Sequence, residues 1–235
     1  MPKLVLIPGL MCDEMLWKPM LQEFKNNHLA EIISVGSCSE IEKFSQTVSK
    51  NIRKDVVLIG FSMGAWIALS LFYHLENYCK GLVLISSAPG YLKQTTKDHL
   101  LNYIHLISSG HFETYINSDY EQDISAVNKD NQNIKINLLN MMRRQGADVA
   151  IRQLNAILEC NNHFSYLNQI RCPTLLIRGA DDKSINIARQ EHMLGEIPKA
   201  ELSIIPKAAH YVPIENPQTT TSVIDEWLLK HNICT

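Results

Sequence analysis

A short apolar run followed by a glycine-flanked serine and a helical pattern is the feature that most limits how this chain folds. Residues 55–69 read DVVLIGFSMGAWIAL. The unbroken run from Val56 to Ile59 is typical of a strand that is buried on both faces of a parallel sheet. From Met63 onward the apolar residues recur at helical spacing. Ser62 is therefore predicted to lie on a sharp turn between a buried strand and a helix.

Gly60 and Gly64 flank Ser62 in the pattern G-x-S-x-G. At so sharp a turn, a side chain at either glycine would collide with the neighbouring strand or helix. The helix that starts here points its free amides and its positive dipole end at the serine, where negative charge develops during acyl transfer. An ordinary Gly-Ser turn has the same letters, but the strand before it and the helix after it favour a nucleophilic serine.

Strand and helix patterns alternate along most of the chain. The expected strands are residues 3–8, 30–35, 56–59, 80–86, 174–178 and 201–205. Helical patterns are expected at residues 14–27, 40–53, 63 onward, 185–194 and 218–230. Six strands that alternate with helices predict an α/β fold with a doubly wound, mainly parallel sheet.

The alternation stops between residues 88 and 171, where no strand pattern occurs. Helical periodicity is present there at residues 97–107, 134–144 and 147–158. The polar stretch from Asn117 to Asn133 predicts a long loop or a lid hinge. We therefore expect one core made of residues 1–87 and 172–235, with residues 88–171 inserted as a helical cap.

Composition excludes several classes of protein. The chain has 22 Lys and Arg against 24 Asp and Glu, a near balance that argues against a nucleic-acid partner. No apolar run approaches the roughly 18 residues of a membrane span. The sequence has no residue spacing typical of a metal site and no glycine motif typical of a nucleotide site, so neither a metal nor a cofactor is expected. Nothing in the sequence indicates an oligomeric state.

The cysteines and the first residues predict a cytoplasmic protein. The six cysteines are scattered without a C-x-x-C pair, which is typical of reduced thiols in a chain of this length. The first apolar run ends at Pro8-Gly9 without a longer apolar region or a small-residue cleavage site. A first strand is therefore a better interpretation of this run than a signal peptide.

Residues able to carry out chemistry follow several of the predicted strands. Ligands bind at the carboxyl ends of such strands, where the chain supplies Ser62, then Asp181 and Asp182, then His210. A serine hydroxyl needs a base to remove its proton, and a histidine suits that task near neutral pH. A carboxylate is needed to orient the imidazole. The other eight histidines lie on or beside predicted helices or in the 88–171 stretch, so His210 is the predicted base.

Three segments give the chain a family resemblance. They are GFSMG at 60–64, LLIRGADD at 175–182 and AAHYVPIENP at 208–217, of which the last is similar to a recurrent G-H-x-x-x-x-E-x-P ending. In these segments the chain resembles α/β-hydrolase fold proteins, of the small capped type that includes carboxylesterases and pimeloyl-carrier methyl ester esterases. The resemblance covers nearly the whole chain outside the cap. It implies that Asp182, the fourth residue of a G-x-x-D element, is the catalytic acid, with Asp181 as the alternative.

The resemblance also implies an oxyanion hole made by the backbone amides of Leu10 and Met63. Many relatives have His-Gly where this chain has Pro8-Gly9, but the contributing amide belongs to the residue after the glycine. Relatives often carry a D-x-P-G-x-G-x-S loop where this chain has residues 35–39. Its loss is expected to widen or reshape the cleft beside the nucleophile.

The leading hypothesis is a serine hydrolase that cleaves a carboxylic ester or thioester through an acyl-enzyme on Ser62. The substrate is expected to be a small acyl ester, either free or bound to a carrier. Two alternatives stay open: a carbon-carbon bond hydrolase or lyase with the same triad, and a hydrolase-fold ligand-binding protein with little turnover. Tyrosines and methionines of the cap either line an acyl pocket or pack its helices, and Arg143 and Arg144 either face a carboxylate or a carrier or are solvated.

Overall fold

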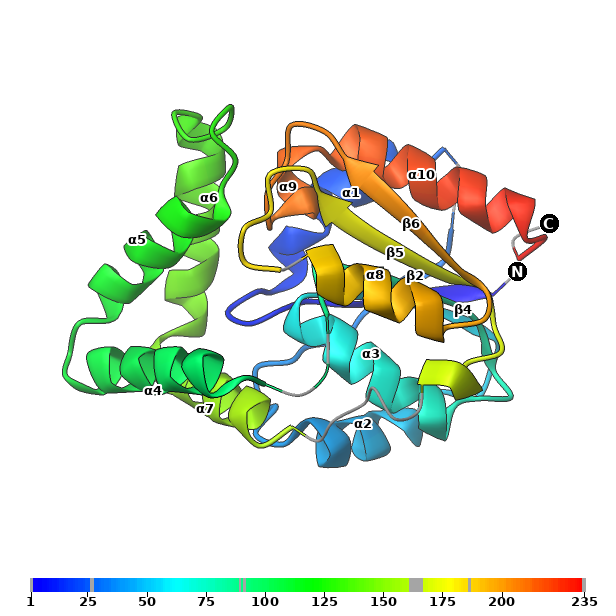
Figure 1. Cartoon of the computed structure of the whole chain (residues 1–235), viewed down its shortest axis with the longest axis horizontal. Helices are drawn as coiled ribbons and strands as arrows, with labels where there is room; N and C mark the ends of the chain where they lie inside the picture. The colour runs from blue at the N-terminus through cyan, green and yellow to red at the C-terminus, as the bar shows by residue number, and fades with distance from the viewer. Residues whose placement is uncertain are drawn as a thin grey trace.

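A six-stranded parallel sheet lies between two layers of helices in the computed structural model, which describes residues 2–25, 28–88, 90, 92–160, 167–185 and 187–233 (Figure 1). The strands are β1 (Lys3–Ile7), β2 (Ala30–Ile32), β3 (Val56–Phe61), β4 (Cys79–Ile85), β5 (Thr174–Gly179) and β6 (Ala200–Ile205). They are ordered β2-β1-β3-β4-β5-β6, and every neighbouring pair is parallel. The predicted α/β fold with six strands is confirmed.

Each face of the sheet is covered by its own helices. Alternate side chains of β3 enter different buried clusters: Val57 and Ile59 pack on one face, and Val56 and Leu58 pack on the other. The first face is covered by η1 (Glu14–Leu16), α1 (Lys18–Glu23), α9 (Val212–Glu215) and α10 (Pro217–Lys230). The second face is covered by α2 (Ile41–Ser49), α3 (Met63–His74) and α8 (Ile187–Glu196). Burial on both faces explains the unbroken apolar run.

The single helix predicted over residues 14–27 is wrong. The chain forms the 3₁₀ turn η1, and an α-helix begins only at Lys18. Pro19 lies in the first turn of α1, where its missing amide costs nothing, whereas the interior of a longer helix would lose a hydrogen bond there. α1 ends at Glu23, and residues 26 and 27 of the prediction lie outside the described part of the chain.

Between β4 and β5 the described residues form four α-helices: α4 (Gln94–Ser108), α5 (Phe112–Asp123), α6 (Gln132–Gln145) and α7 (Ala147–Leu158). Figure 1 shows this α4–α7 segment gathered at one side of the sheet. The segment is helical as the sequence predicted, while its division from the core as a separate cap over residues 88–171 stays a prediction. None of the described helices is long and apolar enough to cross a membrane.

The loop predicted from Asn117 to Asn133 is wrong in its first half, because α5 continues to Asp123. Tyr115, Ile116 and Tyr120 lie on one side of this helix and are almost completely buried. Their burial outweighs the polar composition of the segment, since helices in proteins are stabilised mainly by packing of an apolar face. Only residues 124–131 form the connection to α6.

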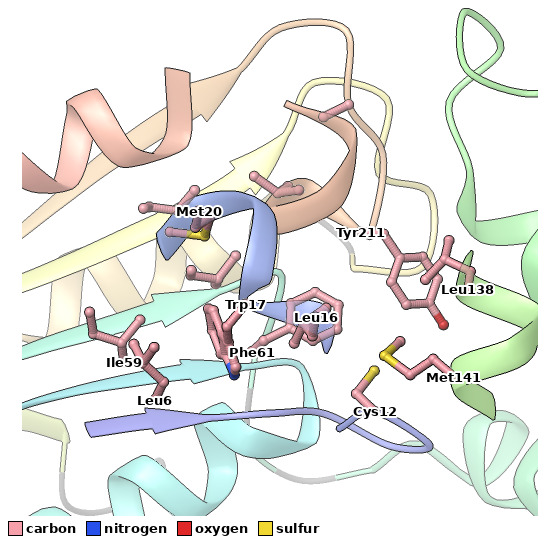
Figure 2. Packing of buried hydrophobic residues seen from close by; sticks show 14 of the residues in the cluster. Leu6, Cys12, Leu16, Trp17, Met20, Ile59, Phe61, Leu138, Met141 and Tyr211 are labelled. Atoms are coloured by element: carbon pink, nitrogen blue, oxygen red, sulfur yellow. The ribbon is translucent and has the colours of Figure 1, made fainter. Parts of the chain in front are cut away.

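The core on the first face continues from the sheet into the α4–α7 segment. Leu138 and Met141 of α6 belong to the same buried cluster as Cys12, Phe61 and Tyr211. Figure 2 shows these side chains meeting where α6 approaches the loops that follow β1 and β6. The tyrosines and methionines of the segment are therefore largely packing residues, although Tyr103 and Tyr115 also line a pocket. Tyr91 and Phe164 lie outside the described residues.

Candidate active site

Ser62 lies between the end of β3 and the start of α3 with a strained backbone. Its φ is 52° and its ψ is −117°, a region that residues with side chains rarely adopt. The flanking glycines are required by close approach: a Cβ at Gly60 would lie 2.4 Å from the Gly64 oxygen, and a Cβ at Gly64 would lie 2.1 Å from the Ile7 oxygen. The turn therefore holds Ser62 against both its own helix and the end of β1.

The end of β4 supports the strained turn. The Ser62 amide donates to the Ile85 carbonyl at 2.9 Å, and Ser87 Oγ donates to the Ser62 carbonyl at 2.9 Å. Gln190 of α8 donates in turn to the Ser87 carbonyl at 3.2 Å. These contacts use the backbone groups of the turn on both sides of the serine, so its hydroxyl is presented by a fixed backbone.

The structure brings Ser62, His210 and Asp182 together in one hydrogen-bonded chain. The distance from His210 Nε2 to Ser62 Oγ is 3.1 Å, and the distance from His210 Nδ1 to Asp182 Oδ2 is 3.2 Å. Asp182 and His210 are buried, with 5% and 6% of their surface exposed, and Ser62 is half-buried. These are the residues that the sequence predicted to meet from the ends of three different strands.

Asp182 rather than Asp181 faces the histidine. Its other oxygen, Oδ1, accepts the backbone amides of Ser184 and Ile185 at 2.9 and 3.0 Å. Burial by itself raises the pKa of Asp182, but the charge and hydrogen bond of His210, the Ile185 amide and the charge of Arg178 outweigh burial and hold the pKa below its ordinary value. Asp181 is exposed, and its amide donates to the Ala208 carbonyl at 3.0 Å.

The loop that carries His210 is fastened to the α4–α7 segment. The His210 amide donates to the carbonyl of Asp123, the last residue of α5, at 3.0 Å. Glu215 binds both sides of this junction: Oε1 accepts the Ala209 amide at 2.8 Å, and Oε2 accepts the Ser125 amide at 2.9 Å. The position of the imidazole therefore depends on residues of the segment as well as on β6.

Two carboxylates of α5, Asp119 and Asp123, lie near the histidine and were missed by sequence reasoning. Tyr211 donates its hydroxyl to Asp119 Oδ2 at 2.9 Å, and Ser184 Oγ donates to Asp123 Oδ1. Burial, with the charge of Asp123, raises the pKa of Asp119 to about 7, and burial likewise raises the pKa of Asp123. Their spacing of four residues places them on one face of α5, and this was the only signal in the sequence.

The negative charges of the aspartates around His210 raise the pKa of its imidazole. Burial by itself lowers the pKa of the imidazole, because it disfavours the charged form. The charges of Asp182 and Asp123, the hydrogen bond to Asp182 and the charge of Asp119 outweigh burial and raise the pKa of His210 to about 9. The imidazole therefore holds its proton to a higher pH than an ordinary histidine does.

The two amides predicted for an oxyanion hole have no acceptor within the described part of the protein. Met63 is the first residue of α3, where a helix leaves its amides unpaired. Leu10 lies in a turn that is closed by the Cys12 amide and the Gly9 carbonyl at 3.2 Å. This turn lies against the strand-to-helix turn that carries Ser62, because a Cβ at Gly9 would come within 2.9 Å of the Phe61 ring. Unpaired amides beside a nucleophile suit an oxyanion.

A pocket of about 440 Å³ begins at this turn. Leu10 lines it together with residues of α4, α5 and α7 and with Lys183 and Ser184 of the loop after β5. Asp119 and Asp123 belong to its wall, so the wall combines carboxylates with tyrosines. Among the described residues, no group of three or more His, Cys, Asp or Glu side chains could hold a metal ion.

The two arginines of α6 bind carboxylates of the chain itself. Arg143 forms two hydrogen bonds to the carboxylate of Glu113 at 2.8 and 2.9 Å. Arg144 forms two to Asp13 at 3.0 and 3.2 Å. Both guanidinium groups are about half exposed. The sequence left open whether these two arginines face a carboxylate, face a carrier or are solvated. In the structure, each pairs with a carboxylate of the chain itself.

Comparison with known proteins gives consistent similarities. Residues 37–217 match the hydrolase family described as serine aminopeptidase, S33. The chain is 22% identical to the biotin biosynthesis bifunctional protein BioHC of Cellvibrio japonicus over 96% of its own length, but it spans only 47% of that protein. It is 23% identical to a pimeloyl-[acyl-carrier protein] methyl ester esterase of Wigglesworthia glossinidia brevipalpis, covering 97% of this chain and 94% of the relative.

Solved structures show the same fold. A thermophilic esterase from Thermogutta terrifontis, solved with malate bound, superimposes with a TM-score of 0.88. The match covers 98% of this chain and 90% of the esterase, at 18% sequence identity. At that identity the likeness establishes the architecture, and the chemistry has to be argued from the residues.

Proposed function

The chain belongs to the α/β-hydrolase family described as serine aminopeptidase, S33, and is an esterase-like enzyme; we propose that it cleaves a carboxylic ester or thioester through an acyl-enzyme on Ser62. The observation that carries the proposal is the continuous chain of hydrogen bonds from Ser62 Oγ through His210 to Asp182. Acyl transfer by a serine requires a nucleophile, a base and a carboxylate that orients the base. Here these are a serine on a strained strand-to-helix turn, a buried imidazole and a buried carboxylate.

In the proposed reaction, Ser62 Oγ attacks the carbonyl carbon of the ester while His210 Nε2 takes the hydroxyl proton. Asp182 accepts the hydrogen bond from the Nδ1–H of His210 and stabilises the imidazolium that forms. The amides of Leu10 and Met63 bind the oxyanion of the tetrahedral intermediate. The intermediate then expels the alcohol or thiol, which receives the proton from His210. Water then gives a proton to the same imidazole and attacks the acyl carbon, and the bond to Ser62 Oγ breaks. Ser62 Oγ takes the proton back from His210 as the acid is released.

The residues that line the pocket favour a substrate whose acyl group is uncharged. When ionised, Asp119 and Asp123 would repel a free carboxylate at the far end of the acyl chain, and they outnumber Lys183 of the same wall. Tyr103 and Tyr115 give the same wall an apolar component. Two curated relatives are named for an ester carried by an acyl-carrier protein, and we include a carrier-bound acyl ester in the proposed substrate class. A cytoplasmic location and the absence of a nucleic-acid partner stay predictions.

Wild-type protein is expected to react with a fluorophosphonate probe at Ser62, because the activated hydroxyl attacks phosphorus as it attacks a carbonyl. The measurement is the mass of the modified peptide after digestion. Activated short-chain esters should also give a burst of alcohol, equal to about one per active site, as the acyl-enzyme forms. Labelling without a burst would favour the lyase alternative, and folded protein that neither labels nor turns over would refute the proposal.

Removing the charges of Asp119 and Asp123 is expected to move activity to lower pH. Only neutral imidazole accepts the serine proton, so kcat/KM should rise with pH through the pKa of His210. Both carboxylates raise that pKa, so Asp119→Asn and Asp123→Asn should each shift the rising limb of kcat/KM to lower pH. The measurement is the pH profile of kcat/KM.

Glu113→Gln is the matched control, since Glu113 also lies on α5 but is exposed and pairs with Arg143. It should leave the pH profile unchanged. If the rising limbs of kcat/KM coincide in the wild type, Asp119→Asn and Asp123→Asn, these two carboxylates do not act on His210.

A further inference from the structure

Gln153 is a completely buried carboxamide on α7 with both of its ends in use. Its Oε1 accepts the Met11 amide at 2.9 Å, and its Nε2 donates to the Val35 carbonyl at 3.0 Å. A buried amide side chain without partners is costly, so these two bonds account for a polar residue on the packed face of the helix. Gln153 thus joins the α4–α7 segment to the loops that follow β1 and β2.

The bond to Met11 falls on the turn that carries Leu10. Met11 is the third residue of this turn, and its φ is 58°. A residue with a side chain is disfavoured in this region, so the orientation of the peptide between Leu10 and Met11 needs an outside contact to hold it. The Leu10 amide belongs to the preceding peptide, which shares the Leu10 Cα. That preceding peptide also carries the Gly9 carbonyl, which accepts the Cys12 amide at 3.2 Å. Because this bond closes the turn, rotation of one of the two peptides changes the direction of the other.

A second contact fastens the same part of α7. Arg152 donates from Nε and Nη2 to the Gly36 carbonyl at 3.2 and 3.0 Å. Leu154, the residue after Gln153, lines the pocket. One turn of α7 therefore contacts the Gly9–Cys12 turn, the 35–36 loop and the pocket of about 440 Å³ together.

We propose that Gln153 is a positioning residue that holds the Gly9–Cys12 turn so that the Leu10 amide faces the developing oxyanion. This inference rests on the proposed acyl-enzyme reaction. It assigns to the α4–α7 segment a part in transition-state stabilisation in addition to shaping the pocket. A purely structural tie is the competing explanation, and it predicts a loss of folded protein without a selective effect on the transition state.

The test replaces Gln153 by methionine, which has a similar length and no hydrogen-bonding amide. kcat and KM are measured on an activated short-chain ester. A separate measurement gives the affinity for a boronic acid that forms a tetrahedral anion on Ser62. The affinity for an uncleavable ether analogue of the same ester reports ground-state binding. Two variants serve as controls. Arg152→Met removes the tie to Gly36 alone, and Asn155→Leu replaces an exposed amide that donates to the Ile151 carbonyl of its own helix.

Gln153→Met is expected to lower kcat by about 10-fold to 100-fold, since displacing one oxyanion donor costs somewhat less than deleting it. Boronic acid affinity should fall in the same proportion as kcat/KM, while KM and ether affinity stay within about twofold of wild type. Both controls should keep kcat within about threefold of wild type. A wild-type kcat in Gln153→Met, an equal loss in Arg152→Met, or a parallel loss of ether affinity would overturn the inference.

Gln153→Glu keeps the test decisive if the methionine variant does not fold. The introduced carboxyl group, when protonated, can accept from Met11 and donate to Val35, as the wild-type amide does, whereas the ionised carboxylate cannot donate. The ratio of variant to wild-type kcat/KM should therefore approach one wherever the introduced carboxyl group is protonated, and a ratio that stays low throughout the pH range would overturn the inference. Wild-type protein without labelling or turnover would overturn the proposed function itself, which separates the two failures.

Discussion

Ser62→Ala and His210→Ala are each expected to lower kcat for an activated short-chain ester by about 10⁵-fold to 10⁶-fold. The serine supplies the bond-forming oxygen, and the imidazole is the group within 3.1 Å that can take its proton. Because the two residues act as one unit, the double variant should be no slower than either single variant. The measurement is steady-state turnover at a pH above the pKa of His210. Burial lowers this pKa, but the surrounding carboxylates outweigh burial and raise it to about 9.

Fluorophosphonate labelling should be lost in both variants, while their melting temperatures stay close to that of the wild type. His105→Ala is a suitable control, since His105 is exposed on α4. Turnover in Ser62→Ala above about a hundredth of the wild-type rate would show that the reaction uses another nucleophile. Independent, multiplying losses in the double variant would contradict a shared proton transfer.

Asp182→Asn is expected to lower kcat by about 10⁴-fold, and Asp181→Asn is expected to change it by less than about threefold. An amide at position 182 presents an N–H toward His210 Nδ1 and so favours the tautomer with its proton on Nε2. That tautomer cannot accept the proton of Ser62 Oγ, which lies 3.1 Å away. The two adjacent aspartates are matched in type and differ in that one faces the histidine.

The pH profile provides a second readout for the Asp182 prediction. Asp182 raises the pKa of His210 through its charge and its hydrogen bond, so the residual activity of Asp182→Asn should rise at lower pH than that of the wild type. A larger loss in Asp181→Asn than in Asp182→Asn would reverse the assignment. Equal small losses in both would point to a third carboxylate, and Asp123 is the next candidate because its charge also acts on His210.

Local patterns predicted the sheet and the residues at its strand ends. A strand buried on both faces has to be apolar throughout, which made most of β3 (Val56–Phe61) visible in the apolar run of residues 56–59. The glycines at 60 and 64 are fixed by contacts within the same strand-turn-helix unit and with β1. Parallel strands place their carboxyl ends at one edge, so Ser62, Asp182 and His210 could be expected to meet without any knowledge of the packing.

The contributions of the α4–α7 segment could not be predicted in this way. Asp119, Asp123 and Gln153 act through contacts with loops more than 60 residues away in sequence, and these contacts depend on how each helix is turned against the sheet. A polar residue on a packed helical face was the only local signal for Gln153. The same difficulty explains the error in the Asn117–Asn133 stretch, where composition indicated a loop and three buried side chains decided otherwise.

The bonds between the histidine loop and α5 limit how substrate reaches the pocket. If the whole α4–α7 segment swung outward as a rigid gate, the bond from the His210 amide to the Asp123 carbonyl and the bond from the Ser125 amide to Glu215 would both break. The imidazole would then lose its support at the moment the pocket opened. Admission of substrate and integrity of the catalytic base are therefore compatible only if α5 stays docked while other parts of the segment move.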